Sequence, residues 1–156
     1  MKYLIKPEDI ETAINYYQQK QILWLDTEIA DFQTKNPQLS LISILDDPAQ
    51  GDQVTILDML NYTNLIPEFI NKIMINSKIE KVFHNAKYDT KFLGKTKVKN
   101  VTCTLEIAKS IPYYLLPIPD FTLKTLTEKL SDFKNIDKSE QSSDWKVRPL
   151  TEKQLN

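Results

Sequence analysis

The stretch ILWLDTEIADF, residues 22–32, begins as an apolar run and then places two acids, Asp26 and Glu28, two positions apart. The apolar run predicts a buried strand. Side chains two apart in a strand point to the same face, so the two carboxylates should lie roughly 6 to 7 Å apart along the strand. Neighbouring like charges at the end of a buried strand need compensation. They are either part of a functional site or two exposed acids at a strand end, and this stretch alone favours neither.

Segments around this strand predict an α/β domain in which helices and strands follow one another. Three short apolar or alternating runs, separated by turn residues, predict an antiparallel meander: residues 21–28, 39–47 and 53–60. Further strands are predicted at residues 2–5, 78–85 and 98–103. Helices are predicted at residues 7–20, 65–74, 86–94, 104–111 and 121–130. Gly94 should close the third of these helices. The last helix should carry Leu123, Leu126 and Leu130 on one side.

The composition is that of one globular domain. The chain has 156 residues, of which 41% are hydrophobic and 26% charged, close to the average of soluble proteins. No apolar run approaches the ~20 residues of a membrane span, and the start MKYLIKPEDIE lacks the apolar core of a signal peptide. The lone Cys103 makes no internal disulfide and agrees with a reducing compartment. We therefore expect a cytoplasmic protein with no membrane association, and no obligate protein partner is evident.

The net charge of −1 decides little about partners. With 20 basic and 21 acidic residues, the chain has no overall positive field that would indicate nucleic-acid binding. An enzyme that holds a polyanion through bound cations and a few local lysines needs no high isoelectric point, and every basic residue but one is a lysine. Nucleic acid is therefore not excluded as a ligand.

A second polar cluster follows another predicted strand. The segment VFHNAKYDTKFL, residues 82–93, sets Asn85 and Asp89 four positions apart on the first turns of a helix, hence on one face. A purely structural interpretation is available: Asn85 caps the helix and Asp89 lies near the positive end of its dipole. His84, taken alone, is better explained as a hydrogen-bonded turn histidine than as a catalytic base.

Neighbouring strands of one sheet can present their ends to a common cleft, which would bring three carboxylates together. With one His and one Cys in the chain, the available ligands at such a site are oxygens. Oxygen sites favour hard cations, here Mg²⁺ or Mn²⁺. Magnesium held by a few carboxylates commonly completes its shell with substrate phosphate, which indicates phosphoryl transfer or phosphodiester hydrolysis.

Four segments resemble the ribonuclease D-like branch of the DEDD 3'-to-5' exonucleases, which is related to the proofreading domain of family A DNA polymerases. They are LDTE, LSLISI, HNAKYDTKFL and DKSEQSSDWKVRPLTEKQL, in this order and spacing. The resemblance covers nearly the whole chain from Ile22 onward. It implies a ribonuclease H-like fold, in which a mixed sheet of about five strands, an antiparallel meander plus parallel strands, is flanked by helices.

The resemblance also implies the catalytic residues. Asp26 and Glu28 correspond to the acids of the first exonuclease motif, and Asp89 to the acid of the second. In the family these carboxylates hold two Mg²⁺ or Mn²⁺ ions about 4 Å apart, one activating the attacking water and the other stabilising the departing 3' oxygen. Asp26 would bridge both ions, Glu28 would help hold the water-activating ion, and Asp89 would support the other. The implied substrate is a single-stranded 3' end of DNA or RNA.

Five further residues are implied to bind substrate: Thr27, Phe32, His84, Asn85 and Tyr88. Thr27 would lend a backbone contact to the terminal nucleotide. Asn85 would lie near the substrate. Phe32, four positions after Glu28, would act as an apolar wedge against the terminal base.

The sequence departs from the family at the third motif, Tyr-x-x-x-Asp, which in this branch follows LTEKQL and supplies a fourth carboxylate. None of the seven tyrosines has an acid four positions on. His84 and Asp89 have the His-x4-Asp spacing of the histidine branch, but that interpretation would leave no second motif. Thr151 and Gln154 form a capping box that predicts a helix beginning just after Leu150, with only five residues left after Thr151. We therefore expect a single domain over residues 1–156 whose native chain continues past Asn156.

Three interpretations follow. The first is a 3'-to-5' exonuclease with a two-metal mechanism, in which this chain alone would have little hydrolytic activity because it lacks the fourth carboxylate. The second is a catalytically inactive ribonuclease H-like module that binds nucleic acid or protein. In the third, the acids are unrelated surface groups and Mg²⁺ or Mn²⁺ would not stabilise the fold.

Overall fold

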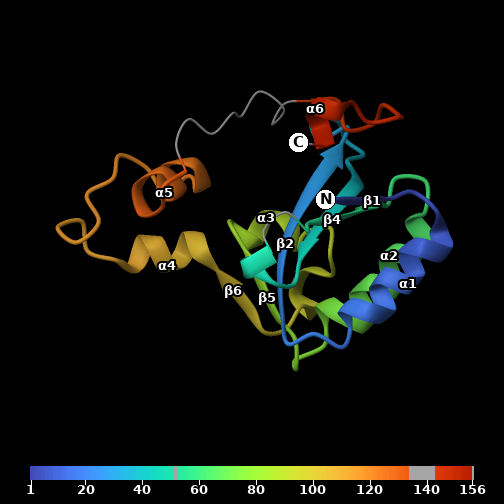
Figure 1. The fold of residues 1–156 in the computed structure, drawn as a ribbon, viewed down its shortest axis with the longest axis horizontal. Coiled ribbons are helices and arrows are strands. Elements are labelled where there is room, and N and C mark those ends of the chain that lie inside the picture. The colour runs from blue at the N-terminus through green and yellow to red at the C-terminus, as the bar shows by residue number, and fades with distance from the viewer. Residues whose placement is uncertain (51–52, 134–142, 156) are drawn as a thin grey trace.

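The structure is a computed structural model that describes residues 1–50, 53–133 and 143–155. Figure 1 shows the helices and strands along the chain. The strands are β1 (Lys2–Leu4), β2 (Ile22–Ala30), β3 (Gln38–Leu45), β4 (Thr55–Asp58), β5 (Glu80–Phe83) and β6 (Val101–Cys103). The helices are α1 (Pro7–Tyr17), α2 (Ile66–Phe69), α3 (Ala86–Asp89), α4 (Thr104–Ser110), α5 (Leu123–Leu130) and α6 (Glu152–Leu155). A π-helical turn, Ile70–Met74, extends α2, and single 3-10 turns lie at Pro48–Gln50, Thr63–Leu65 and Lys95–Lys97.

The strands form one mixed sheet in the order β1-β4-β3-β2-β5-β6. β2 pairs antiparallel with β3, and β3 antiparallel with β4, which confirms the predicted meander. The pairs β1–β4, β2–β5 and β5–β6 are parallel. The sheet has six strands, one more than the family resemblance implies, because the short β1 pairs with the outer side of β4.

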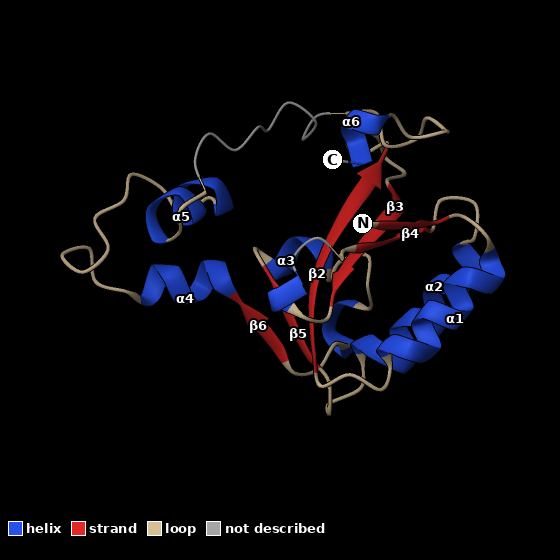
Figure 2. Ribbon diagram, viewed as in Figure 1, coloured by secondary structure: helices blue, strands red, loops and turns tan. Residues whose placement is uncertain are grey.

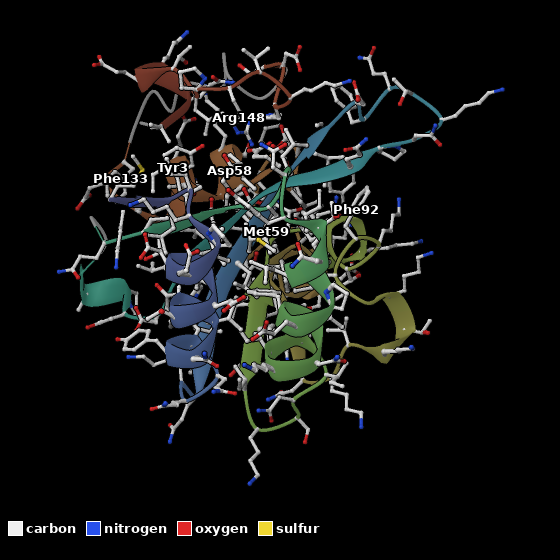
Figure 3. All side chains as sticks on the ribbon, turned by 90° about the vertical axis from the view of Figure 1, so that its right-hand side faces the viewer. Tyr3, Asp58, Met59, Phe92, Phe133 and Arg148 are labelled. Carbon is white, nitrogen blue, oxygen red and sulfur yellow. The ribbon has the colours of Figure 1, made fainter. Side chains whose placement is uncertain are left out.

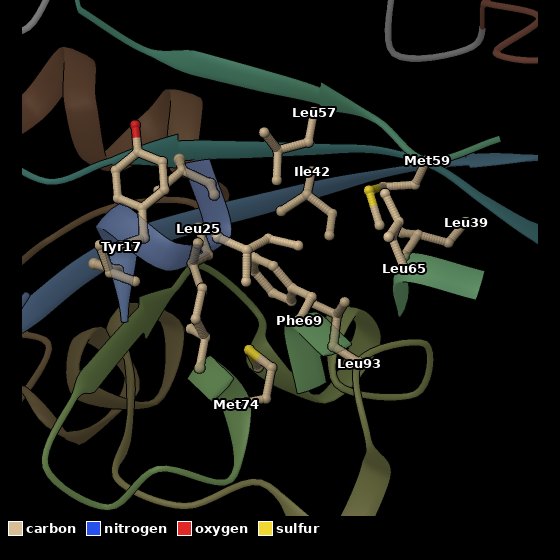
Figure 4. Close-up of a cluster of buried hydrophobic side chains, with 14 of the residues drawn as sticks. Tyr17, Leu25, Leu39, Ile42, Leu57, Met59, Leu65, Phe69, Met74 and Leu93 are labelled. Carbon is tan, nitrogen blue, oxygen red and sulfur yellow. The ribbon is translucent and has the colours of Figure 1, made fainter. Parts of the chain in front are cut away.

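One face of the sheet packs against α1 and α2, which lie together on one side of the strands in Figures 1 and 2. Leu23 and Leu25 of β2 point into this core, and Phe69 of α2 is fully buried within it, as Figure 4 shows for Leu25 and Phe69. Each large side chain buried in this way contributes about 1.5 to 3 kcal/mol. Because neighbouring strand residues alternate, this packing turns Asp26 and Glu28 toward the other face.

Two helix predictions differ from the structure, and a third helix buries little of its leucine-lined side. The regular part of the helix predicted at 86–94 ends at Asp89, and turns continue to Gly94, whose φ of +113° suits glycine. The helix predicted at 65–74 changes from α to π geometry at Ile70. In α5 only Leu126 is buried, whereas Leu123 and Leu130 are 55% and 67% exposed. The reason is that α5 packs only on a small cluster with α4, away from the sheet (Figure 1).

The C-terminal segment lies on the face opposite α1. Trp145 and Leu150 pack there against Leu41 of β3 and Ile56 of β4. The predicted capping box is present: the Thr151 amide donates to Gln154 Oε1 at 3.0 Å, and the Gln154 amide donates to Thr151 Oγ1 at 3.2 Å. Residues 137–142, part of the last segment of the family resemblance, lie outside the described residues. Within the described ranges, every helix is too short or too polar to cross a bilayer.

Candidate functional site

The acids of β2 lie on the exposed face in the middle of the sheet. In the pairing with β3, Asp26 lies opposite Ser43 and Glu28 opposite Leu41. The register shifts directly after Glu28, which marks a bulge that bends the strand at this point. The Asp26 side chain is exposed and that of Glu28 half-buried. The two acids therefore flank each other on one surface, as the sequence predicts.

α3 brings the third acid to the same place. It begins three residues after the end of β5, the parallel neighbour of β2. Because the two strands are parallel, α3 starts near the carboxyl end of β2. Asp89 is 3% exposed, and its Oδ1 accepts a hydrogen bond of 2.7 Å from Thr27 Oγ1. Thr27 is itself buried, between the two acids of β2. This hydrogen bond ties the second acidic segment directly to the first.

The three carboxyl groups influence one another. Desolvation, followed by repulsion from Asp26 and Asp89, raises the pKa of Glu28 to about 8. Desolvation and the charge of Asp26 raise the pKa of Asp89 to about 6, against the opposing effect of the Thr27 hydrogen bond. Desolvation also raises the pKa of Asp26, although its carboxylate reaches solvent. A strand end that binds nothing has no need to hold three acids at such a cost, so this arrangement argues against unrelated surface acids.

The residues predicted to bind substrate take different positions around the acids. Asn85 occupies the N-cap position of α3, as predicted, with a left-handed backbone of φ 66°. Its side chain, however, makes no capping hydrogen bond. Tyr88 is 39% exposed, and desolvation followed by the charges of Asp89, Glu28 and Asp26 raises its pKa. Its hydroxyl therefore stays protonated beside the acids.

His84 lies near the acids, whereas no hydrogen bond or ring contact among the described residues joins Phe32 to them. The Nδ1 atom of His84 is hydrogen-bonded to Thr104 Oγ1 at 2.9 Å, which supports a structural role in the turn after β5. Its charge, when present, lowers the pKa of Asp26, so it lies within electrostatic reach of that acid. Phe32 follows β2 and is 48% exposed, with its ring free of the main core.

Comparison with known proteins identifies the family. The family model described as 3'-5' exonuclease matches residues 2–156. This chain belongs to the 3'-5' exonuclease family. Ribonuclease D of Bartonella henselae is 30% identical over 158 residues, and ribonuclease D of Desulfotalea psychrophila is 28% identical over 155. These alignments cover 99% and 96% of this chain but 36% and 38% of the relatives, so the chain spans little more than a third of their length.

Solved exonuclease structures confirm the ribonuclease H-like fold. The structure superposes on Escherichia coli RNase D with a TM-score of 0.76 at 24% identity, covering 99% of this chain and 39% of that one. The catalytic core of RRP6 from Trypanosoma brucei gives a TM-score of 0.77 at 22% identity, covering 97% and 40%. NrnC of Brucella melitensis with bound Mg²⁺ gives 0.67 at 21% identity, covering 99% and 68%.

The donor set of this exonuclease-family domain is suited to a hard divalent cation. Asp26, Glu28 and Asp89 offer carboxylate oxygens, and a cation would offset both the desolvation and the repulsion that raise the pKa of Glu28 and of Asp89. Within the described residues, however, no three His, Cys, Asp or Glu side chains converge closely enough to surround one ion. A cation here would therefore need water or substrate oxygens to complete its shell.

Sequence reasoning missed an interaction that positions the C-terminal segment on the site face. Arg148 donates from Nε and Nη2 to the two oxygens of Asp58, at 2.5 and 2.9 Å, and from Nη2 to Ser40 Oγ at 2.8 Å. The Tyr3 hydroxyl also donates to Asp58. Arg148, Asp58 and Tyr3 are labelled in the upper part of Figure 3. Arg148 is the only arginine of the chain, which is the one sequence signal that could have singled it out.

Proposed function

We propose that this domain releases nucleotides from a single-stranded 3' end by hydrolysing the terminal phosphodiester bond, with Mg²⁺ or Mn²⁺ bound at Asp26, Glu28 and Asp89. The observation that carries the proposal is that α3 brings the buried Asp89 to the acids of β2, where Thr27 Oγ1 donates a hydrogen bond of 2.7 Å to Asp89 Oδ1. Desolvation, followed by the charges of the neighbouring acids, raises the pKa of Glu28 to about 8 and that of Asp89 to about 6. Membership of the exonuclease family supports it. Bound divalent ions would supply Lewis acidity at the phosphate and a deprotonated water as nucleophile.

The chain's own residues would position the ions and the strand. Thr27 would orient the Asp89 carboxylate for a ligand through the hydrogen bond from its hydroxyl to Oδ1. Tyr88 keeps its hydroxyl proton beside the acids and would donate it to a phosphate oxygen. Asn85 and the exposed Phe32 would contact the terminal nucleotide, Phe32 by stacking or wedging against its base.

The test is hydrolysis of 3'-labelled RNA and DNA oligonucleotides in Mn²⁺ by this chain and by a longer one. Asp26→Ala should abolish release of the labelled nucleotide in whichever chain is active. The matched control is Glu11→Ala, an exposed acid on α1, which should leave hydrolysis unchanged. Thermal melts establish that both variants fold. Equal activity of Asp26→Ala and the unaltered protein would sink the assignment.

A second candidate function is nucleic-acid binding without hydrolysis. It is favoured by the spacing of the acids, since within the described residues no three of them converge on one ion. It predicts oligonucleotide binding with no release of label at any concentration of Mn²⁺, in both this chain and the longer one. Hydrolysis that requires Asp26 excludes it.

A further inference from the structure

The segment from α3 to the start of β6 carries a concentration of positive charge that the proposed reaction does not use. Residues 87–99 contain five lysines and a single acid, Asp89, in a chain whose net charge is −1. All five lysines are exposed, whereas Asp89 is buried: Lys87, Lys91, Lys95, Lys97 and Lys99. We call these five residues the lysine track. Their charge faces solvent and is not balanced by an acid on the same segment.

Lysines elsewhere in the described chain are often paired with acids. Ion pairs join Lys20 to Asp46 at 2.7 Å, Lys72 to Glu68 at 2.6 Å, and Lys146 to Asp31 at 2.9 Å, among others. Across the described ranges, the five side chains of the lysine track take part in no ion pair. Five like charges within residues 87–99 add to the positive potential of one segment, which would attract a polyanion.

The lysine track begins at the acidic site. Tyr88 directly precedes Asp89 on α3 and lies between the first two lysines of the track, Lys87 and Lys91. The Lys91 ammonium is 5.7 Å from the centre of the Tyr88 ring, and the Tyr88 and Phe92 rings meet edge to face at 6.1 Å. Lys87 and Lys91, four positions apart, lie on one side of the turns that begin at α3. The acids, an exposed aromatic ring and the first lysines are thus continuous.

The backbone of this segment is held firmly, so the lysines project from a fixed surface. Leu93 is fully buried in the main core. The Lys95 amide donates to the Thr90 carbonyl at 2.7 Å, and the Lys99 amide donates to the Met74 carbonyl at 3.1 Å. The segment leads from the end of β5, beside the acids, back to the start of β6 at the opposite end of the sheet. Figure 3 shows this margin of the molecule at Phe92.

We propose that the lysine track binds the backbone phosphates of a single nucleic-acid strand upstream of its 3'-terminal nucleotide, with the Tyr88 ring available for base stacking. This inference rests on the proposed function, because it places the strand that the acids would shorten. A protein partner fits the segment less well. Protein interfaces have an apolar centre, and Tyr88 is the one large apolar side chain exposed between residues 87 and 99.

The test measures binding separately from hydrolysis. Fluorescence anisotropy in EDTA reports the affinity for a labelled oligonucleotide of about ten nucleotides, in RNA and DNA forms, at several salt concentrations. The test variant carries Lys95→Gln, Lys97→Gln and Lys99→Gln, the three lysines of the track that follow Gly94 and lie farthest along the chain from Asp89. The control carries the same exchange at three exposed lysines elsewhere in the chain: Lys35, Lys78 and Lys129.

The triple track variant should bind the long oligonucleotide about tenfold or more weakly at low salt, and its salt slope should fall by about 2, since each phosphate contact on a single strand contributes about 0.7. The control should match the unaltered protein, as should both variants in binding a labelled dinucleotide. Melting midpoints establish folding, and the single reversal Lys97→Glu gives a second variant with the same expected direction.

Three results would overturn the inference. Equal affinities of the track and control variants would remove the lysine track from the binding surface. Equal weakening for the dinucleotide and the long oligonucleotide would place the effect at the terminal nucleotide rather than upstream. Failure of the unaltered protein to bind any oligonucleotide would also end it. If the unaltered protein binds oligonucleotides with the expected dependence on salt but does not hydrolyse them, the proposed function is refuted. The inference about the lysine track would then still hold.

Discussion

Arg148→Ala should destabilise the domain by about 3 kcal/mol, because it leaves the buried Asp58 carboxylate without its cation. Asp58 is 5% exposed on β4, and the Arg148 side chain is 19% exposed. The guanidinium makes two hydrogen bonds to the carboxylate and donates further to the Trp145 and Val147 carbonyls at 3.0 and 2.9 Å. Truncation removes all of these while Asp58 stays in place.

The magnitude follows from how much of the pair is buried. Removing one partner of a buried ion pair typically costs about 3 to 5 kcal/mol. We take the lower end because Arg148 keeps some contact with solvent and because the Tyr3 hydroxyl still donates to Asp58. For a domain of this size, about 3 kcal/mol corresponds to a fall of roughly 6 to 12 °C in the melting midpoint.

The assay is urea and thermal unfolding followed by circular dichroism. Lys146→Ala is the matched control, because it removes an ion pair two residues away whose lysine is 60% exposed, and its midpoint should not move measurably. The double variant Asp58→Asn with Arg148→Met should be more stable than Arg148→Ala, since it leaves no unpaired buried charge. A loss below about 1 kcal/mol for Arg148→Ala would refute the reasoning, because that is the range of exposed ion pairs.

Three further outcomes are expected. Thr27→Val should lower the free energy of unfolding by about 1 to 3 kcal/mol in denaturant titrations, because Asp89 loses a buried hydrogen bond; an unchanged midpoint would contradict the 2.7 Å contact. In EDTA, the melting midpoint should fall as pH rises from about 5 to 8, because the folded state keeps protons on Glu28 and Asp89 that the unfolded state has released. Added Mn²⁺ should reduce this fall in the midpoint. The variant Glu28→Gln should show a flatter dependence of the midpoint on pH. Gly94→Ala should cost more than about 1 kcal/mol in the same titrations, since φ is +113° and the added Cβ would lie 3.1 Å from Ile70 Cγ2; equal stability would show that the turn relaxes.

Much of the sheet could be predicted from the sequence because its strands obey a period of two and are separated by turn residues. The antiparallel meander is one consequence, and the burial of Leu23 and Leu25 is another. The helices were harder. Leu123 and Leu130 of α5 have helical spacing, but spacing cannot say whether a neighbouring element is present to cover them, and only Leu126 found one. Tertiary packing, rather than local pattern, decided those positions.

The acids of the site were predictable for a different reason. Asp26, Glu28 and Asp89 stand where buried segments turn polar, which is visible in the sequence. The hydrogen bond from Thr27 to Asp89 could not be predicted. Thr27 is buried on the opposite side of β2, and nothing in the neighbouring sequence indicates its partner. The Arg148–Asp58 pair was hidden because its partners are 90 residues apart and each appears ordinary in its own segment.

The alternation of β2 makes the core and the site depend on each other. A slip of one residue in the pairing of β2 would turn Leu23 and Leu25 to the exposed face and carry Asp26 and Glu28 into the core. The exposed leucines would each forfeit about 1.5 to 3 kcal/mol, and the buried acids would add the larger cost of unpaired charge. The apolar residues at the start of ILWLDTE therefore do more than fill the interior. Their burial fixes the register that holds both acids beside α3, so stability of the core enforces the geometry of the site.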